Sequence, residues 1–262
     1  MSVHTVSAKS VILYHRSYRV VQGSFWLVLA QILLFVIPVS LCSVIFYPEI
    51  TRTLCQVAQE ILTPHYPAES LYIVEEQFLT FIDDFSYLHL PSTSPTPFLC
   101  LVNVLVCGVL LLFLPRVEKF KPIMIFLTMI TVVHLSSSLF FLFAPESFPY
   151  DATEYSRLYI LQQISIGFFV PIIMGAAVMA LPASLPSRCA MVVLTYLYSL
   201  LFGSLRYIVL LYLLEVSSLL YMAVLYFITG PLIDFIYITG IYSVFAARVA
   251  KNMKGDARLW KW

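Results

Sequence analysis

Apolar residues in this chain are gathered into long continuous blocks, and these blocks restrict what the chain can fold into. A helical block of about eighteen residues or more crosses the ~30 Å hydrocarbon core of a bilayer. Charged residues make up only 11% of the chain, against about 25% in soluble domains. The sequence therefore predicts an all-α, polytopic membrane protein with about six transmembrane helices, over residues 24–46, 98–114, 123–143, 158–181, 189–214 and 219–247.

The largest polar segment, residues 47–97, separates the first two blocks. Apolar residues recur in its first part with the spacing of one helix face: Ile50, Leu54, Val57 and Ile61. A second helix is expected from Glu69 to about Phe85, again with its apolar residues on one face. The segment is therefore predicted to form a small external cap of amphipathic helices between the first and second transmembrane helices.

Basic residues gather on one side of the predicted membrane domain, residues 24–247. Lys and Arg concentrate in the N-terminal segment 1–23, the turn 115–122, at Arg188 and in the amphipathic tail 248–262. The loops on the opposite side hold Arg52 and Arg157 together with most of the acidic residues. The positive-inside rule then predicts that both termini are cytoplasmic and that the cap is external. Compact loops without an N-x-S/T sequon favour a bacterial inner membrane.

Two charged residues lie deep within predicted spans, Arg206 in residues 189–214 and Asp234 in residues 219–247. A charge at the bilayer centre costs at least ~3 kcal/mol on insertion scales, so it usually faces a partner or a wet cavity. Straight antiparallel helices would offset this pair by ~10 Å, which the break at Gly230-Pro231 can reduce. Two arrangements stay open: an ion pair joining the last two spans, or Arg206 extended outward to Glu215.

Further polar side chains lie at a similar depth on other predicted spans: Asn103, His134, Ser137, Gln162 and Gln163. Hydrogen bonding between membrane helices explains each one alone, at under ~2 kcal/mol. Their common depth instead suggests that they join Arg206 and Asp234 in a polar pocket that opens to the external side under the cap. These seven residues are the substrate-site candidates. The acidic cap residues are the candidates for partner docking: Glu75, Glu76, Asp83 and Asp84.

Motifs for catalysis or cofactor binding are missing from the sequence. No GxSxG, HExxH, P-loop or GxGxxG pattern occurs, so no catalytic residue is assigned. No Cys or His grouping has the spacing of a zinc site, and we expect neither a metal nor a cofactor. The expected partners are membrane lipids and other membrane-protein subunits, not nucleic acid.

Two functional hypotheses of different classes are compatible with these features. The first is a non-catalytic inner-membrane subunit of a cell-envelope complex that makes or exports a polysaccharide or a lipid-linked glycan. The missing motifs, the short cap and the small cytoplasmic surface motivate it, with the cap and the last two spans as docking surfaces. The alternative is a small transporter or membrane-embedded enzyme. In that case Arg206 would bind an anionic group, while His134 or Asp234 would exchange protons.

Overall fold

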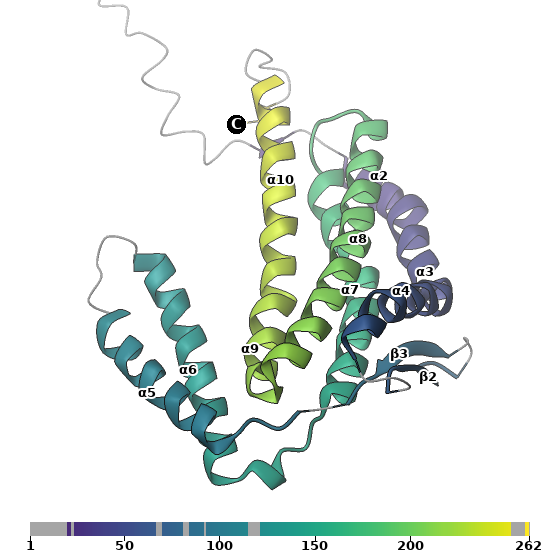
Figure 1. Ribbon diagram of the computed structural model, residues 1–262. Coiled ribbons are helices and arrows are strands. Elements are labelled where there is room, and N and C mark those ends of the chain that lie inside the picture. Colours follow the sequence, from purple (N-terminus) through teal and green to yellow (C-terminus); the bar gives the residue numbers. More distant parts are fainter. Residues whose placement is uncertain are drawn as a thin grey trace, which may run out of the picture.

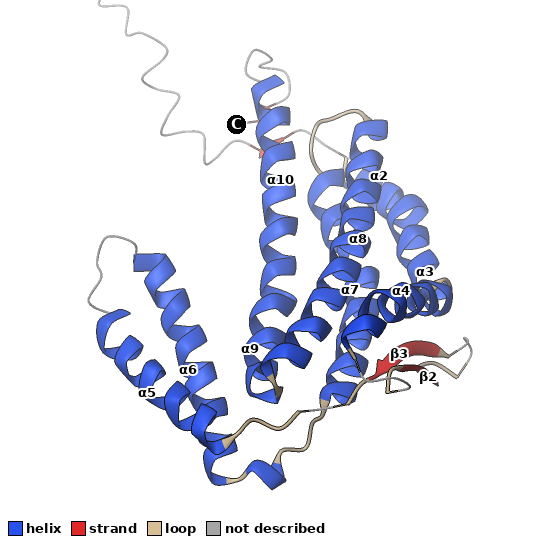
Figure 2. Cartoon of the chain, viewed as in Figure 1, coloured by secondary structure: helices blue, strands red, loops and turns tan. Residues whose placement is uncertain are grey.

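The computed structural model describes residues 20–21, 24–66, 70–80, 84–91, 93–114, 121–252 and 260–261, and helices dominate these segments (Figure 2). Most of segment 1–23 and of tail 248–262 therefore lies outside the described residues. The helices are α2 (Phe25–Gln31), α3 (Ile37–Ile45), α4 (Tyr47–Leu62), α5 (Pro97–Phe113), α6 (Lys121–Phe143), α7 (Ala152–Met179), α8 (Leu185–Ser217), α9 (Met222–Phe227) and α10 (Ile233–Asn252). Single π-helical turns join α2 to α3 (Ile32–Val36) and α9 to α10 (Ile228–Leu232).

Five helical stretches are long and apolar enough to cross a membrane: Phe25–Ile45, Ile123–Phe143, Ala152–Met179, Leu185–Ser217 and Leu219–Asn252. The protein is therefore an all-α, polytopic integral membrane protein, as the sequence predicts. The remaining apolar helix, α5, has 17 residues. At ~1.5 Å per residue it is ~26 Å long, slightly short of the ~30 Å core. The count of six spans stays a prediction for this reason.

Helices α7 and α8 form the centre of the molecule. In the most apolar stretch of each helix, 44% of α7 and 39% of α8 is buried, against 17% for α6 and 11% for the first span. In Figure 1, α10 stands beside α7 and α8, whereas the α5–α6 hairpin leans away and meets the other helices near α9. We call the end that holds α4 and the start of α9 the cap end. The opposite end, with Arg188 and Arg248, is the basic end.

Two apolar clusters occupy the two ends of this bundle. The cluster at the cap end joins α4 and the cap to α7 and α8, with Tyr155 and Leu211 fully buried. The cluster at the basic end joins the first span to α7, α8 and α10 around Val36 and Met174. Between the two clusters lies a layer of buried polar side chains, which includes Arg206 and Asp234.

Only one of the two helices predicted for the cap is present. Helix α4 forms over residues 47–62, but the helix expected from Glu69 to Phe85 is wrong. Instead, β2 (Tyr72–Glu76) pairs antiparallel with β3 (Phe85–His89), with Glu76 opposite Phe85 and Tyr72 opposite His89. Strand β3 is buried from Phe85 to Leu88 between β2, α4 and α7. Strand β3 is buried on both faces by elements that lie far away in the sequence. A periodicity read from residues 69–85 alone therefore could not predict this strand.

Side-chain hydroxyls complete the free edge of β3. The outward amides of β3 and of Leu90 just after it donate to hydroxyls on two helices: Ser86 to Thr51 Oγ1 (3.1 Å), Leu88 to Ser156 Oγ (3.1 Å) and Leu90 to Thr153 Oγ1 (3.1 Å). A buried strand edge without such acceptors would leave unpaired amides, each costing about 1–3 kcal/mol. These hydroxyls on α4 and α7 therefore fix the cap on the bundle.

Candidate functional site

Arg206 and Asp234 form a two-point ion pair inside the polar layer. Arg206 NH1 and NH2 each lie 3.0 Å from one carboxylate oxygen of Asp234, and the two residues are 6% and 5% exposed. Of the two arrangements left open by the sequence, the structure has the pair, and Arg206 does not extend to Glu215. Parallel hydrogen bonds between a guanidinium and a carboxylate are among the strongest polar contacts in proteins. The pair fastens α8 to α10.

The break at Gly230-Pro231 makes this contact possible. Residues Ile228–Leu232 form a π-helical turn in which Gly230 leaves helical geometry, at φ −82° and ψ −118°. The Gly230 carbonyl turns to Arg206, whose NH1 donates to it at 3.3 Å, and the Thr229 hydroxyl donates to the Leu225 carbonyl. Both carbonyls also accept a backbone amide, that of Ile233 at Gly230 and that of Ile228 at Leu225, so the side chains add second hydrogen bonds at the break.

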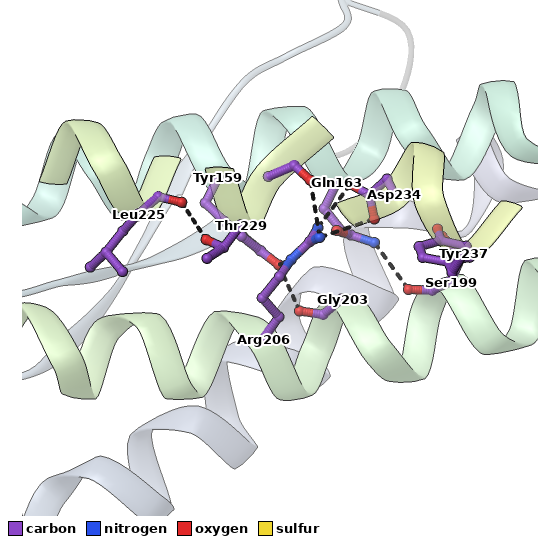
Figure 3. A network of polar contacts seen from close by, with 10 residues as sticks. Tyr159, Gln163, Ser199, Gly203, Arg206, Leu225, Thr229, Asp234 and Tyr237 are labelled. Carbon is purple, nitrogen blue, oxygen red and sulfur yellow. Dashed lines mark hydrogen bonds and ion pairs between the residues drawn. The ribbon is translucent and has the colours of Figure 1, made fainter. Parts of the chain in front are cut away.

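Tyrosine and small residues surround the pair (Figure 3). Arg206 Nε donates to the Tyr159 hydroxyl at 2.6 Å, which in turn donates to the Gly203 carbonyl at 2.9 Å. The guanidinium also lies 5.4 Å from the centre of the Tyr159 ring, within cation–π range. All three nitrogens of Arg206 are thus bound by groups of this chain. The sequence gives no direct sign of Tyr159 or Gly203, because their roles depend on how α7 packs against α8.

The predicted glutamines lie on α7 next to this network. Gln163 Nε2 donates to the Ser199 carbonyl at 3.3 Å, and Ser199 Oγ accepts from the Tyr237 hydroxyl at 2.7 Å. Gln163 also lines a small cavity of about 20 Å³, enough for roughly one water molecule. Gln162 lies against Gly230, and among the described residues its buried amide atoms have no hydrogen-bond partner.

The other candidates form a separate group on α5 and α6. His134 Nε2 lies 3.3 Å from Asn103 Oδ1, and the His134 ring stacks on Tyr221 with 4.7 Å between ring centres. Ser137 donates to the Leu220 carbonyl at 2.9 Å. These contacts attach the α5–α6 hairpin to the turn before α9. The structure therefore divides the predicted pocket into two groups: Arg206, Asp234, Gln162 and Gln163 in one, and Asn103, His134 and Ser137 in the other.

Two of the acidic docking candidates are engaged within the chain. Glu75 pairs with Arg52 at 2.8 Å, and Glu76 accepts two hydrogen bonds from Arg157, at 2.7 and 2.8 Å. Asp84 is exposed beside β3, and Asp83 lies outside the described residues. The Glu76–Arg157 contact ties strand β2 to α7. Among the residues that the structure describes, no group of three His, Cys, Asp or Glu side chains could hold a metal ion.

The cap is expected to loosen in acid through Glu76. Hydrogen bonds from Arg157 hold the pKa of the Glu76 carboxyl below its ordinary value, against the opposite effect of partial burial. A carboxyl with a lowered folded-state pKa stabilises the fold above its unfolded-state pKa of about 4.3 and loses that contribution as the pH falls through the lowered value. Hydrogen exchange of β2 and β3, corrected for intrinsic rates, should therefore quicken below about pH 4.

Glu76→Gln should remove this acid dependence and cost at most about 1 kcal/mol at neutral pH, because the pair is partly exposed. Glu75→Gln, at the more exposed pair with Arg52, is the matched control and should change the exchange less. An unchanged acid profile in Glu76→Gln would show that another group controls the cap.

The polar layer can hold α8 and α10 together, because the Arg206 guanidinium and the Asp234 carboxylate satisfy each other's hydrogen bonds. Comparison with known proteins adds no function to this geometry: the chain matches no protein-family model, no curated protein and no solved structure.

Proposed function

We propose that this integral membrane protein is a non-catalytic subunit of a cell-envelope complex in a bacterial inner membrane. The observation that carries the proposal is the small buried share of α6, 17% of its most apolar stretch, on a hairpin that leans away from the bundle (Figure 1). Apolar residues are exposed along this hairpin, among them Leu105 (63%) on α5 and Ile125 (68%) on α6. A second membrane subunit would cover this surface by van der Waals packing between helices.

Arg206 and Asp234 bind each other, and this supports the role of a complex subunit over a role in ligand binding. A site for an anionic substrate needs a cation with several free donors, whereas four of the five Arg206 N–H groups are bound by Tyr159, Gly230 and Asp234. The distribution of Lys and Arg supports an orientation with both termini cytoplasmic and the cap external. In that orientation the cap is a second docking surface.

The proposal extends to a complex that makes or exports a polysaccharide or a lipid-linked glycan. Exposed aromatic rings at the cap end support this part: Tyr72 (49%), Phe78 (43%) and Tyr150 (45%). Aromatic rings beside polar groups offer the flat apolar faces on which sugar rings pack.

Photocrosslinking in intact membranes tests the subunit role. A photoreactive amino acid at Leu105 or Ile125 should crosslink to one and the same membrane protein, which should also copurify in stoichiometric amount in mild detergent. The control position is Leu201 on α8, which is 74% exposed but belongs to the central bundle. Lipid adducts alone at both hairpin positions, together with a protein that purifies as a lone chain, would contradict the proposal.

The alternative, a small transporter or membrane-embedded enzyme, draws on one observation. The helix break at Gly230-Pro231 lies against the Gln162 amide, and broken membrane helices often line substrate sites in transporters. In that case small anions such as acetate or phosphate should raise the unfolding temperature of the wild type and leave that of Gln162→Ala unchanged. No shift with either anion favours the subunit role.

A further inference from the structure

Helix α4 has three distinct faces rather than the two of an ordinary amphipathic helix. One face packs against the cap and the bundle through Leu54, Cys55 and Ala58, which are all buried. A second face is polar and exposed: Glu49, Arg52, Gln56 and Glu60. The third face is apolar yet exposed, with Val57 at 45% and Ile61 at 50%, and Phe46 just before the helix extends it at 56%. An exposed apolar face beside a polar one is typical of a helix that lies in the plane of a membrane interface.

The position of α4 along the bundle agrees with such a location. Helix α4 runs across the long helices at the cap end (Figure 1), and it meets α8 at Ser204 and Ile208. Measured along α8 from Arg188 at the basic end, Ser204 lies ~24 Å away at ~1.5 Å per residue. With Arg188 at one face of a ~30 Å hydrocarbon core, this crossing lies in the cap-end part of that core, a few ångströms inside the boundary with the headgroups.

A groove of about 540 Å³ runs between α4 and α8. Its walls are mostly apolar: Phe46 just before α4, Ile50 and Val57 on α4, and Ile208 on α8. Next to it, α8 exposes Leu205 (60%) and Val209 (45%), so the groove continues into the surface that faces the lipid. The Ser204 hydroxyl in the groove donates to the Leu200 carbonyl at 2.8 Å, so Ser204 on the α8 wall needs no acceptor from an occupant. The groove therefore suits a hydrocarbon chain.

The charges around the groove select the headgroup. Glu49 lines the groove and is exposed, whereas the neighbouring Arg52 is paired with Glu75 at 2.8 Å. The loops of the cap end carry most of the acidic residues of the chain, which repels anionic lipids. A primary ammonium group, in contrast, can donate hydrogen bonds to the Glu49 carboxylate.

From these observations we infer that the groove between α4 and α8 binds one phospholipid of the adjacent leaflet, with an acyl chain along Ile50 and Ile208 and a primary-amine headgroup at Glu49. This site is independent of the proposed complex and of the Arg206–Asp234 pair. It also gives α4 a role that its contacts with the cap do not explain, because those contacts use another face.

Photoreactive lipids test the inference on the full chain in phosphatidylcholine nanodiscs. Phosphatidylethanolamine and phosphatidylglycerol, each with a diazirine in the acyl chain, are added at equal low mole fraction. Adducts of the ethanolamine lipid should concentrate on peptides around residues 46–57 and 204–208. They should exceed those of the glycerol lipid by about threefold, the scale of one exposed ion pair.

Two variants fill the groove from opposite walls, Ser204→Phe and Thr53→Phe. Each should reduce these adducts at least about fourfold, the value of displacing one buried methylene. Ser165→Phe is the matched control. The Ser165 hydroxyl also donates to the carbonyl four residues earlier in its helix, but Ser165 is exposed on α7, away from the groove. Thr53 is exposed on α4, so Thr53→Phe decides the matter if Ser204→Phe does not fold.

Glu49→Gln should abolish the preference for the ethanolamine lipid and keep the total number of adducts. Glu60→Gln, on the same polar face but outside the groove, should keep the preference. The inference is overturned if both Phe variants retain their adducts or if adducts spread evenly over the exposed helices. A preference that survives in Glu49→Gln would overturn the assignment of the headgroup.

Discussion

Replacing Arg206 with Met is expected to destabilise the protein by about 3–5 kcal/mol, because Asp234 is left buried without its partner. Asp234→Leu should cost a similar amount by stranding Arg206. The double variant Arg206→Met/Asp234→Leu removes both charges and should recover most of the loss, since apolar side chains can replace a buried ion pair. Thermal unfolding in detergent, with size-exclusion profiles for the folded fraction, measures each variant.

The control for this series is Arg157→Met at the ion pair with Glu76. The Arg157 side chain is 29% exposed, against 5% for Arg206, so its loss should cost about 1 kcal/mol or less. A double variant less stable than both single variants would show that the two charges do not act as a unit. A double variant that folds but no longer crosslinks at Leu105 would give the pair a role in assembly as well.

Gly175→Ala is the second substitution with a large expected effect. An added Cβ would lie 2.5 and 2.7 Å from the two methyl carbons of Val36 and 3.1 Å from its Cβ. Val36 is fully buried and β-branched, so rotation about χ1 cannot move all three atoms away. Overpacking of this kind typically costs about 1–3 kcal/mol, here at the contact between the first span and α7.

Gly240→Ala is the matched control, because an added Cβ there has no neighbour within 4 Å. Alanine favours helix over glycine, so this variant should be neutral or slightly stabilising. Val36→Ala in the Gly175→Ala background restores room for the new methyl group and should recover part of the loss. If Gly175→Ala unfolds at the wild-type temperature, the close contact between the first span and α7 is wrong.

The interpretation of the polar residues shows how far depth alone can lead. Depth along each span singled out Arg206 and Asp234 and allowed a contact across the Gly230-Pro231 break, and the structure forms that contact. The same criterion put His134 and Asn103 into one pocket with Arg206, whereas they bond to each other on the α5–α6 hairpin. Depth gives one coordinate of a side chain in a membrane, but the rotation and lateral place of each helix depend on packing.

The cap shows the same limit for secondary structure. The helix of residues 47–62 was predictable, because its apolar period is local. Residues 72–89 also carry apolar residues at helical intervals, yet Ile73 and Val74 are β-branched and pair with Leu88 and Tyr87 of β3. Hydroxyls of Thr51, Ser156 and Thr153 then satisfy the outer edge of that strand. Those acceptors come from helices far away in the sequence, so no local pattern in residues 72–89 predicts the β2–β3 hairpin.

Sequence alone determined that this chain is a polytopic helical membrane protein, because a long apolar block has no stable place except a bilayer or a core. It also determined which charged residues need partners, since an unpaired charge in hydrocarbon is costly. Only the tertiary structure decided that Tyr159 and Gly203 complete the surroundings of Arg206, that the cap is part hairpin, and that α4 exposes an apolar face along a groove with α8. These features depend on which helix faces meet. The same pattern of hydropathy is compatible with several ways of packing the helices, so hydropathy does not determine them.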